Sequence, residues 1–210
     1  MEKPLYPSKN MRITQGYEEG THKNSYAIDD AGIDSNISEI YAPFTGIIKK
    51  VYSNDANEVW LESLEPVEYP DGTIDFMTIM FAHDDEISEL FVGKKINKGE
   101  KFYQEGKKGN ATGNHCHIEC AKGKYISPGW YKNNNGYYSI INGKKPEECL
   151  WIDDSIKIID NYNYSFKKIN FPSQETEKKD TKMLIFTCKK KDLYGIYLDN
   201  GDKVYLEKLN

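Results

Sequence analysis

The apolar residues of this chain come in short runs, and this pattern limits the possible folds more than any other feature. Runs rich in aromatic and β-branched side chains are separated by Gly, Asn, Asp and Pro; they lie at 11–15, 26–29, 47–52, 59–62, 76–81 and 116–120. Such runs favour strands, and the residues between them favour turns. Tyrosine is plentiful, with 16 residues, whereas Leu and Ala are scarce for a helical protein. We therefore expect a mostly-β protein built on a twisted antiparallel sheet with one wet face.

The expected domain organisation follows from chain length and from one polar stretch. The length suits one catalytic domain plus a small appendage. Residues 171–180 are polar and charged, so we expect a main domain over 1–165, a linker over 166–180 and a small β-rich segment over 181–210. Asp-Asn-Gly-Asp at 199–202 predicts a hairpin in that segment. Because so short a segment cannot bury a core of its own, it must pack on the main domain, dimerise or be a remnant of something larger. We expect it to serve wall binding or self-association.

Net charge and hydropathy limit the classes of partner that this chain can bind. The net charge of −5 argues against a nucleic-acid binder. Residues 161–210 carry ten Lys against seven Asp or Glu, so this part is +3 and residues 1–160 are −8. We interpret this basic end as an ordinary solvated face, with attraction to an anionic wall polymer as the alternative. No run approaches the roughly 20 apolar residues of a membrane span, and residues 1–7 lack the apolar core of a signal peptide. We expect synthesis in a cytoplasm and no membrane insertion.

The four histidines are His22, His83, His115 and His117. On a strand, residues two positions apart point to the same face, so His115 and His117 would stand side by side. A catalytic zinc usually takes three His, Asp or Glu ligands and leaves one position open for water. By itself a His-x-His pair is also compatible with two half-buried histidines on a wet sheet face.

A structural zinc site is a competing possibility for the same stretch. It would use both of these histidines together with Cys116 and Cys120. A strand places those thiols on the face opposite the imidazoles, so we reject this site. The cysteines show no C-x-x-C pair, and we expect them to be reduced and mostly buried.

The residues around the His-x-His pair resemble a known family. Residues 112–119, TGNHCHIE, resemble the signature TGPHLHFE of the lysostaphin-like zinc endopeptidases, which cleave the peptide part of bacterial peptidoglycan. Residues 41–48, 81–83 and 92–100 resemble further segments of that family in the same order. The resemblance covers about residues 10–122, and every histidine falls on a family motif.

The resemblance implies a fold and a set of roles. It implies the duplicated-hybrid-motif fold, with zinc at the floor of a groove over one face of the sheet. His22, Asp29 and His117 would hold one zinc ion per chain, and His83 and His115 would be the catalytic pair. The resemblance also makes Tyr17, which precedes His22, a candidate for stabilising the oxyanion, although with sixteen tyrosines in the chain a surface or packing role is preferred.

The sequence departs from the family pattern at one ligand. The usual His-x-x-x-Asp spacing is stretched here to His22 and Asp29, which we interpret as a longer loop or bulge before the strand. Asp30 is therefore the alternative ligand, since strand alternation allows only one of the two neighbours to face the metal. Asn114 and Cys116 also replace family residues, and neither belongs to the ligand set.

The expected function is hydrolysis of peptide bonds in bacterial peptidoglycan. A wall-degrading site without a signal peptide suggests a phage endolysin of a Gram-positive, clostridial-type host, made in the host cytoplasm and acting on the wall after release. A bacterial autolysin exported by another route and a tail-associated or virion structural lysin are the other possibilities. The alternative from a different class is a catalytically inactive lysostaphin-like module that binds or activates cell-wall machinery.

Overall fold

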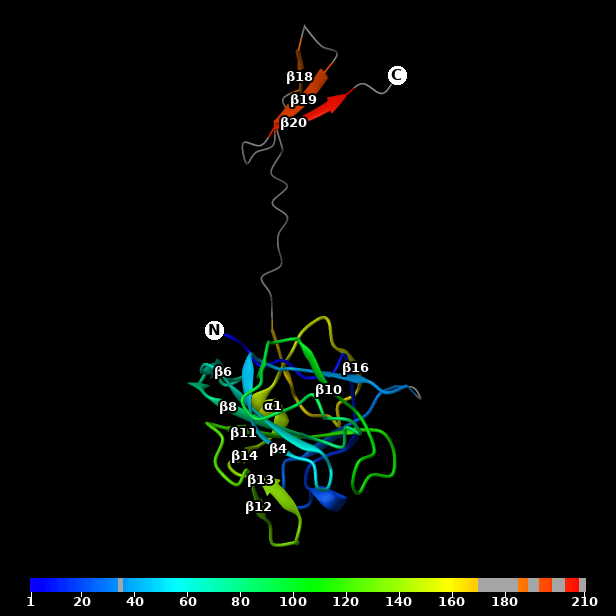
Figure 1. Cartoon of the computed structure of the whole chain (residues 1–210), viewed down its shortest axis with the longest axis vertical. Helices are drawn as coiled ribbons and strands as arrows, with labels where there is room; N and C mark the ends of the chain where they lie inside the picture. The colour runs from blue at the N-terminus through cyan, green and yellow to red at the C-terminus, as the bar shows by residue number, and fades with distance from the viewer. Residues whose placement is uncertain (34–35, 170–184, 189–192, 198–202, 208–210) are drawn as a thin grey trace. The chain divides into compact units, whose positions relative to one another are not determined.

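The structure, a computed structural model, describes residues 1–33 and 36–169 and three later strands. The chain divides into two compact units, Met1–Ile169 and Asn170–Asn210 (Figure 1). In the second unit, three strands pair antiparallel in the order β18 (Ile185–Cys188), β19 (Leu193–Tyr197) and β20 (Lys203–Glu207). The β-rich end expected from the sequence is therefore present. Residues 170–180 of the expected linker and the predicted turn at 199–202 lie outside the described residues.

A nine-stranded sheet dominates the first unit. Its strands follow the order β16 (Lys157–Asp160), β1 (Asn10–Gln15), β2 (Ile28–Asp30), β11 (Cys116–Lys122), β8 (Met77–Ala82), β5 (Glu58–Ser63), β4 (Gly46–Tyr52) and β9 (Lys95–Ile96). β14 (Gly143–Lys144) pairs with the end of β11. The pairs are antiparallel except at one edge, where β1 and β16 run parallel. The mostly-β class is confirmed, and the sheet is mixed because the chain returns to lie beside its first strand.

Short elements surround this sheet. Two-stranded pairs are formed by β3 (Glu39–Tyr41) with β10 (Lys101–Gln104), β6 (Val67–Glu68) with β7 (Ile74–Asp75), β12 (Trp130–Lys132) with β13 (Tyr138–Ile140), and β15 (Trp151–Ile152) with β17 (Lys167–Lys168). The helices are a 3-10 turn, η1 (Gly20–His22), and α1 (Pro146–Cys149). β17 lies in the first unit, so residues 166–169, which the sequence assigned to a linker, belong to the main body. No helix among the described residues has the length and apolar character needed to cross a membrane.

The central strand β11 shows how alternation separates core from site. Cys116, Ile118 and Cys120 are fully or almost fully buried and belong to the main apolar core. The intervening residues His117, Glu119 and Ala121 face the opposite side of the sheet. Ala121 belongs to a smaller apolar cluster on that side, together with Trp60, Met80 and Ala82. This is the period-two pattern of a strand with a different environment on each face.

Candidate metal centre

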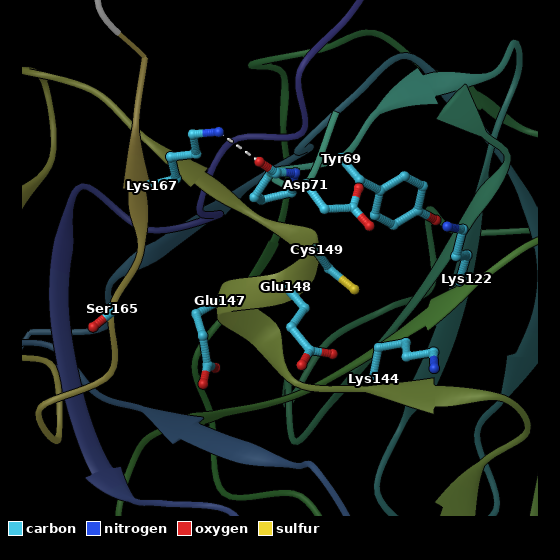
Figure 2. A pocket seen from close by; sticks show the side chains of 10 residues that line it. Tyr69, Asp71, Lys122, Lys144, Glu147, Glu148, Cys149, Ser165 and Lys167 are labelled. Atoms are coloured by element: carbon cyan, nitrogen blue, oxygen red, sulfur yellow. Dashed lines mark hydrogen bonds between the residues drawn. The ribbon is translucent and has the colours of Figure 1, made fainter. Parts of the chain in front are cut away.

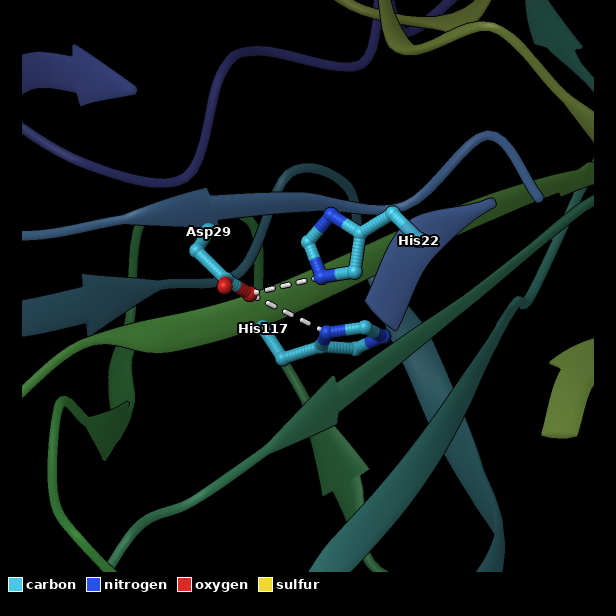
Figure 3. Close-up of side chains that lie close together, drawn as sticks. All are labelled: His22, Asp29 and His117. Carbon is cyan, nitrogen blue, oxygen red and sulfur yellow. Dashed lines mark hydrogen bonds and ion pairs between the residues drawn. The ribbon is translucent and has the colours of Figure 1, made fainter. Parts of the chain in front are cut away.

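Three donor atoms from separate parts of the chain converge on the face of the sheet opposite the main core (Figure 3). His22 Nε2 lies 3.2 Å from Asp29 Oδ1, and His117 Nδ1 lies 3.1 Å from the same oxygen. All three donor atoms lie within 4.8 Å of one another. The arrangement is a compact two-nitrogen, one-oxygen cluster.

Strand pairing places two of the three ligands. Asp29 on β2 and His117 on β11 are direct cross-strand partners, and side chains that lie opposite each other in this way meet on one face of the sheet. His22 comes from η1 in the loop before β2 and is buried. The residues that stretch the spacing form a turn, because the N–H of Ser25 and its hydroxyl both donate to the His22 carbonyl. The longer loop predicted from the sequence is therefore a short turn that returns the chain to β2.

The hydrogen bonds of the two imidazoles decide which nitrogen each can offer. His22 Nδ1 lies 3.1 Å from the Gly16 carbonyl. A carbonyl can only accept a hydrogen bond, so Nδ1 carries the proton and Nε2 keeps the lone pair that can bind a metal. His117 is arranged the other way round, with Nε2 3.2 Å from Glu119 Oε1. Nδ1 of His117 is therefore the nitrogen left to face Asp29.

The hydrogen bonds of the cluster shift the pKa values of His117 and Asp29 in opposite directions. Burial alone would lower the pKa of His117, but hydrogen bonds to Asp29 and Glu119 outweigh it and raise the pKa to about 10. Burial would raise the pKa of Asp29, yet the hydrogen bonds from His117 and His22 bring it well below its ordinary value. Both shifts favour a negative Asp29 beside a positive His117, and a bound cation would take the place of the proton that the two residues share.

The donor set fits zinc. Ligands about 2.0–2.2 Å from a tetrahedral Zn²⁺ are about 3.3 Å from one another, and two imidazoles with one carboxylate are typical zinc donors. The nitrogen–oxygen separations of 3.2 and 3.1 Å match that spacing. Three protein ligands would leave the fourth position for water, as in catalytic zinc sites.

The neighbouring acid, Asp30, lies on the other face of the sheet. Its Oδ1 accepts hydrogen bonds from the Tyr6 hydroxyl at 2.8 Å and from the Arg12 N–H at 2.9 Å. Burial raises the pKa of Asp30 to about 7. Of the two acids that the sequence left open, Asp29 is the one that lies against the imidazoles.

His83 and His115 lie beside this cluster as a second pair. Their ring centroids are 4.5 Å apart, and His115 Nε2 lies 3.6 Å from Asp29 Oδ1. The Nδ1 atoms of both rings meet main-chain carbonyls, that of Lys108 at 2.7 Å and that of Gly113 at 2.9 Å. Each ring therefore keeps Nε2 free to exchange a proton. All four histidines of the chain meet at one place.

The backbone of His83 is in an unusual conformation. Its φ is 87°, whereas the other non-glycine residues with positive φ lie between 53° and 62°. Hydrogen bonds hold it there, from the His83 N–H to the Ala56 carbonyl and from the Lys108 N–H to the His83 carbonyl. Strain of this kind gathers at functional sites, so the conformation is a second, independent sign of a role for His83.

Tyr17 has partners of its own. Its hydroxyl donates to Glu147 Oε1 at 2.9 Å, and its ring stacks on Tyr164 with centroids 4.4 Å apart. Burial, together with this carboxylate, raises the pKa of Tyr17. The structure thus gives Tyr17 the packing role that the sequence favoured; the oxyanion role stays a prediction.

Glu119 is the residue of the site that sequence reasoning missed. It is 2% exposed, and its carboxylate binds both the His117 ring and the main-chain N–H of Ile140. The signal was available, because Glu119 lies two residues after His117 on the same strand and must share its face.

Two pockets bear on where a substrate could lie. A pocket of about 290 Å³ lies between the loop that follows His22 and the β12–β13 hairpin, with Glu119 and Tyr131 in its wall. A second pocket, of about 610 Å³, is lined in part by α1, including Cys149 (Figure 2), and neither pocket has any of the four histidines in its lining. The first adjoins the candidate metal centre, and the second is separate from it.

Comparison with known proteins finds a phage protein among the relatives of this chain. No protein-family model matches the chain. Morphogenesis protein 1 of Bacillus phage B103 is 28% identical over 192 residues, which cover 86% of this chain and 50% of the relative. The chain therefore spans half the length of that curated relative.

Solved structures with a detectable likeness include three peptidases or peptidase-related domains. A zinc containing peptidase from Vibrio cholerae has a TM-score of 0.43 at 20% identity, over 58% of this chain and 37% of that one. The catalytic domain of prophage-encoded EnpA from Enterococcus faecalis has a TM-score of 0.41 at 21% identity, over 62% and 98%. The catalytic domain of the antimicrobial peptidase lysostaphin from Staphylococcus simulans has a TM-score of 0.41 at 17% identity, over 69% and 89%. At these values the likenesses transfer neither activity nor substrate, and the chain is a mostly-β protein with a candidate His–Asp–His metal site and a phage morphogenesis protein among its relatives.

Proposed function

We propose that this chain is a zinc-dependent endopeptidase that hydrolyses peptide bonds in bacterial peptidoglycan. The observation that carries the proposal is the convergence of His22, Asp29 and His117 beside a second pair of histidines that is not among the three donors. One zinc ion per chain would be held by the three clustered residues. The signature at residues 112–119 supports the choice of peptidoglycan over other peptides.

The chemistry divides between the metal and the protein. When bound, zinc lowers the pKa of its water from 15.7 to about 7 and polarises a carbonyl. His83 and His115 would transfer the protons: a neutral ring takes one from the attacking water, and the resulting imidazolium gives it to the leaving amine. Burial lowers the pKa of His83 to about 4, so this ring is neutral at pH 7.

The relative in phage B103 supports a phage setting and favours the virion-associated possibility over a free endolysin. That relative is named a morphogenesis protein, which points to a role in making the particle. A peptidase in the particle would open the wall during infection, whereas an endolysin would open it at release. Mass spectrometry of purified phage particles separates the two, because only a virion-associated enzyme is present in them.

The rival function is a lysostaphin-like module that binds or activates wall machinery without catalysis. The presence of three zinc-type donors and a separate histidine pair favours the enzyme. Incubation of the zinc-loaded protein with walls of defined chemistry, followed by mass spectrometry of the soluble fragments, tests this directly. New free amino and carboxyl ends support the enzyme. Binding to walls without release of fragments, by protein that carries zinc, would favour the rival.

A further inference from the structure

We propose that Glu119 is a positioning residue that fixes how His117 presents itself to the metal. The proposal rests on the proposed zinc site and deepens it. Glu119 follows His117 by two residues on β11, and its Oε1 lies 3.2 Å from His117 Nε2. A carboxylate in this position accepts the Nε2–H and leaves the lone pair on Nδ1, the atom that faces Asp29.

The burial of Glu119 indicates a role beyond packing. The residue is 2% exposed, and a buried carboxylate is costly unless it is paired and hydrogen-bonded. Both of its oxygens are used, Oε1 by the His117 ring and Oε2 by the Ile140 N–H at 3.0 Å. The main-chain donor holds the carboxylate in place, and the carboxylate in turn holds the ring.

The contrast between the two histidine ligands gives this contact its importance. His22 is oriented by a main-chain carbonyl, that of Gly16, which no substitution of a side chain removes. His117 depends on a side chain for the same function. Without Glu119 the ring could protonate on either nitrogen or rotate about its χ2 bond, and part of the binding energy of the metal would be spent on restoring the productive state.

The same carboxylate links the metal site to the β12–β13 hairpin. Ile140 is the last residue of β13, and its cross-strand partner is Trp130. Glu119 also lies in the wall of the pocket between this hairpin and the loop after His22. The orientation of His117 is thereby tied to the base of the hairpin that borders the pocket.

The test compares Glu119→Gln with a matched control, Glu62→Gln. Glu62 is also a buried carboxylate of the large sheet and accepts a main-chain N–H, that of Tyr125 at 2.6 Å, but it has no contact with the four histidines. Zinc affinity is measured by chelator competition on the full chain. We expect the Glu119 variant to lose about 10- to 100-fold in affinity and the Glu62 variant to match the parent protein.

Outcomes separate this inference from the proposed function. A parent protein that binds no zinc overturns both. A parent protein that binds zinc, with Glu119→Gln binding equally well, overturns only the inference. If the variant does not fold, nitrogen NMR of the zinc-loaded parent decides instead: His117 bound through Nδ1 with a slowly exchanging Nε2–H supports the role, and binding through Nε2 overturns it.

Discussion

His83 and His115 face each other with ring centroids 4.5 Å apart, and each ring directs its Nδ1 to a main-chain carbonyl. The two residues come from different parts of the chain, one directly after β8 and the other directly before β11, and those strands pair. The pair is thus fixed by the sheet and by the backbone around it. This arrangement keeps both Nε2 atoms available beside the candidate metal centre.

The first prediction separates metal ligands from proton-transfer residues. His117→Ala should lose both zinc and activity, because it removes a donor atom. His115→Ala should keep zinc and lower kcat by about 10²- to 10⁴-fold, because it removes a proton-transfer group. Metal analysis of both purified variants, with steady-state kinetics on a soluble peptide, checks the division. Equal loss of zinc from two folded variants would show that the assigned roles are wrong.

The second prediction concerns the two neighbouring aspartates. Asp29→Asn should bind zinc much more weakly, since a neutral amide replaces the one carboxylate of the cluster. Asp30→Asn should keep its zinc, because its side chain contacts Tyr6 and Arg12 on the opposite face. Zinc content of the two variants is the measurement. The reverse result would make Asp30 the ligand.

The third prediction is a pH dependence at His83. Burial, followed by the nearby charge of His117, lowers its pKa to about 4 from an unfolded value of about 6.5. The unfolded chain therefore binds more protons between these values, and this residue makes stability fall as the pH drops from about 6.5 to about 4. Proton NMR of the metal-free protein should show the His83 ring neutral throughout pH 5–8. A midpoint near 6.5 would contradict the lowered pKa.

The fourth prediction concerns removal of the metal. Chelated protein should lose wall lysis and regain it on addition of zinc, while a chelator already saturated with zinc serves as the control. Zinc should also raise the melting temperature, because a ligand at 100 times its Kd stabilises the folded state by about 2.7 kcal/mol. Full lysis by protein shown to be free of metal would refute the zinc mechanism.

The fifth prediction concerns the second unit. All residues of the candidate site lie in the unit Met1–Ile169, so a chain that ends at Ile169 should bind zinc and cleave a small soluble peptide normally. If residues 170–210 serve attachment, we expect this shortened chain to bind intact walls less well. If they serve self-association, we expect it to have fewer subunits per particle in solution than the full chain. Unchanged wall binding and an unchanged number of subunits would count against both roles. An insoluble or zinc-free product would show that residues 170–210 complete the main body.

The sequence predicted the parts of the site that depend on local pattern. Strand alternation predicted that His115 and His117 lie on the same face of their strand. It also predicted that Cys116, on the other face, is buried in the core. Parts that depend on distant pairing were not predictable. The parallel contact of β1 with β16 joins segments more than a hundred residues apart, and the hydroxyl of Tyr17 meets Glu147 through a similar return of the chain. The positive φ of His83 also has no local signal, because hydrogen bonds to Ala56 and Lys108 impose it.

The hydrogen bond from Ile140 to Glu119 separates the hairpin into a fixed base and an exchangeable tip. The base is joined to the metal ligands, whereas residues 134–136 are exposed and lie in the connecting turn. Surface turns of this kind accept insertions and replacement more readily than paired strands do. We therefore expect the ligand geometry to tolerate changes of sequence between positions 134 and 136.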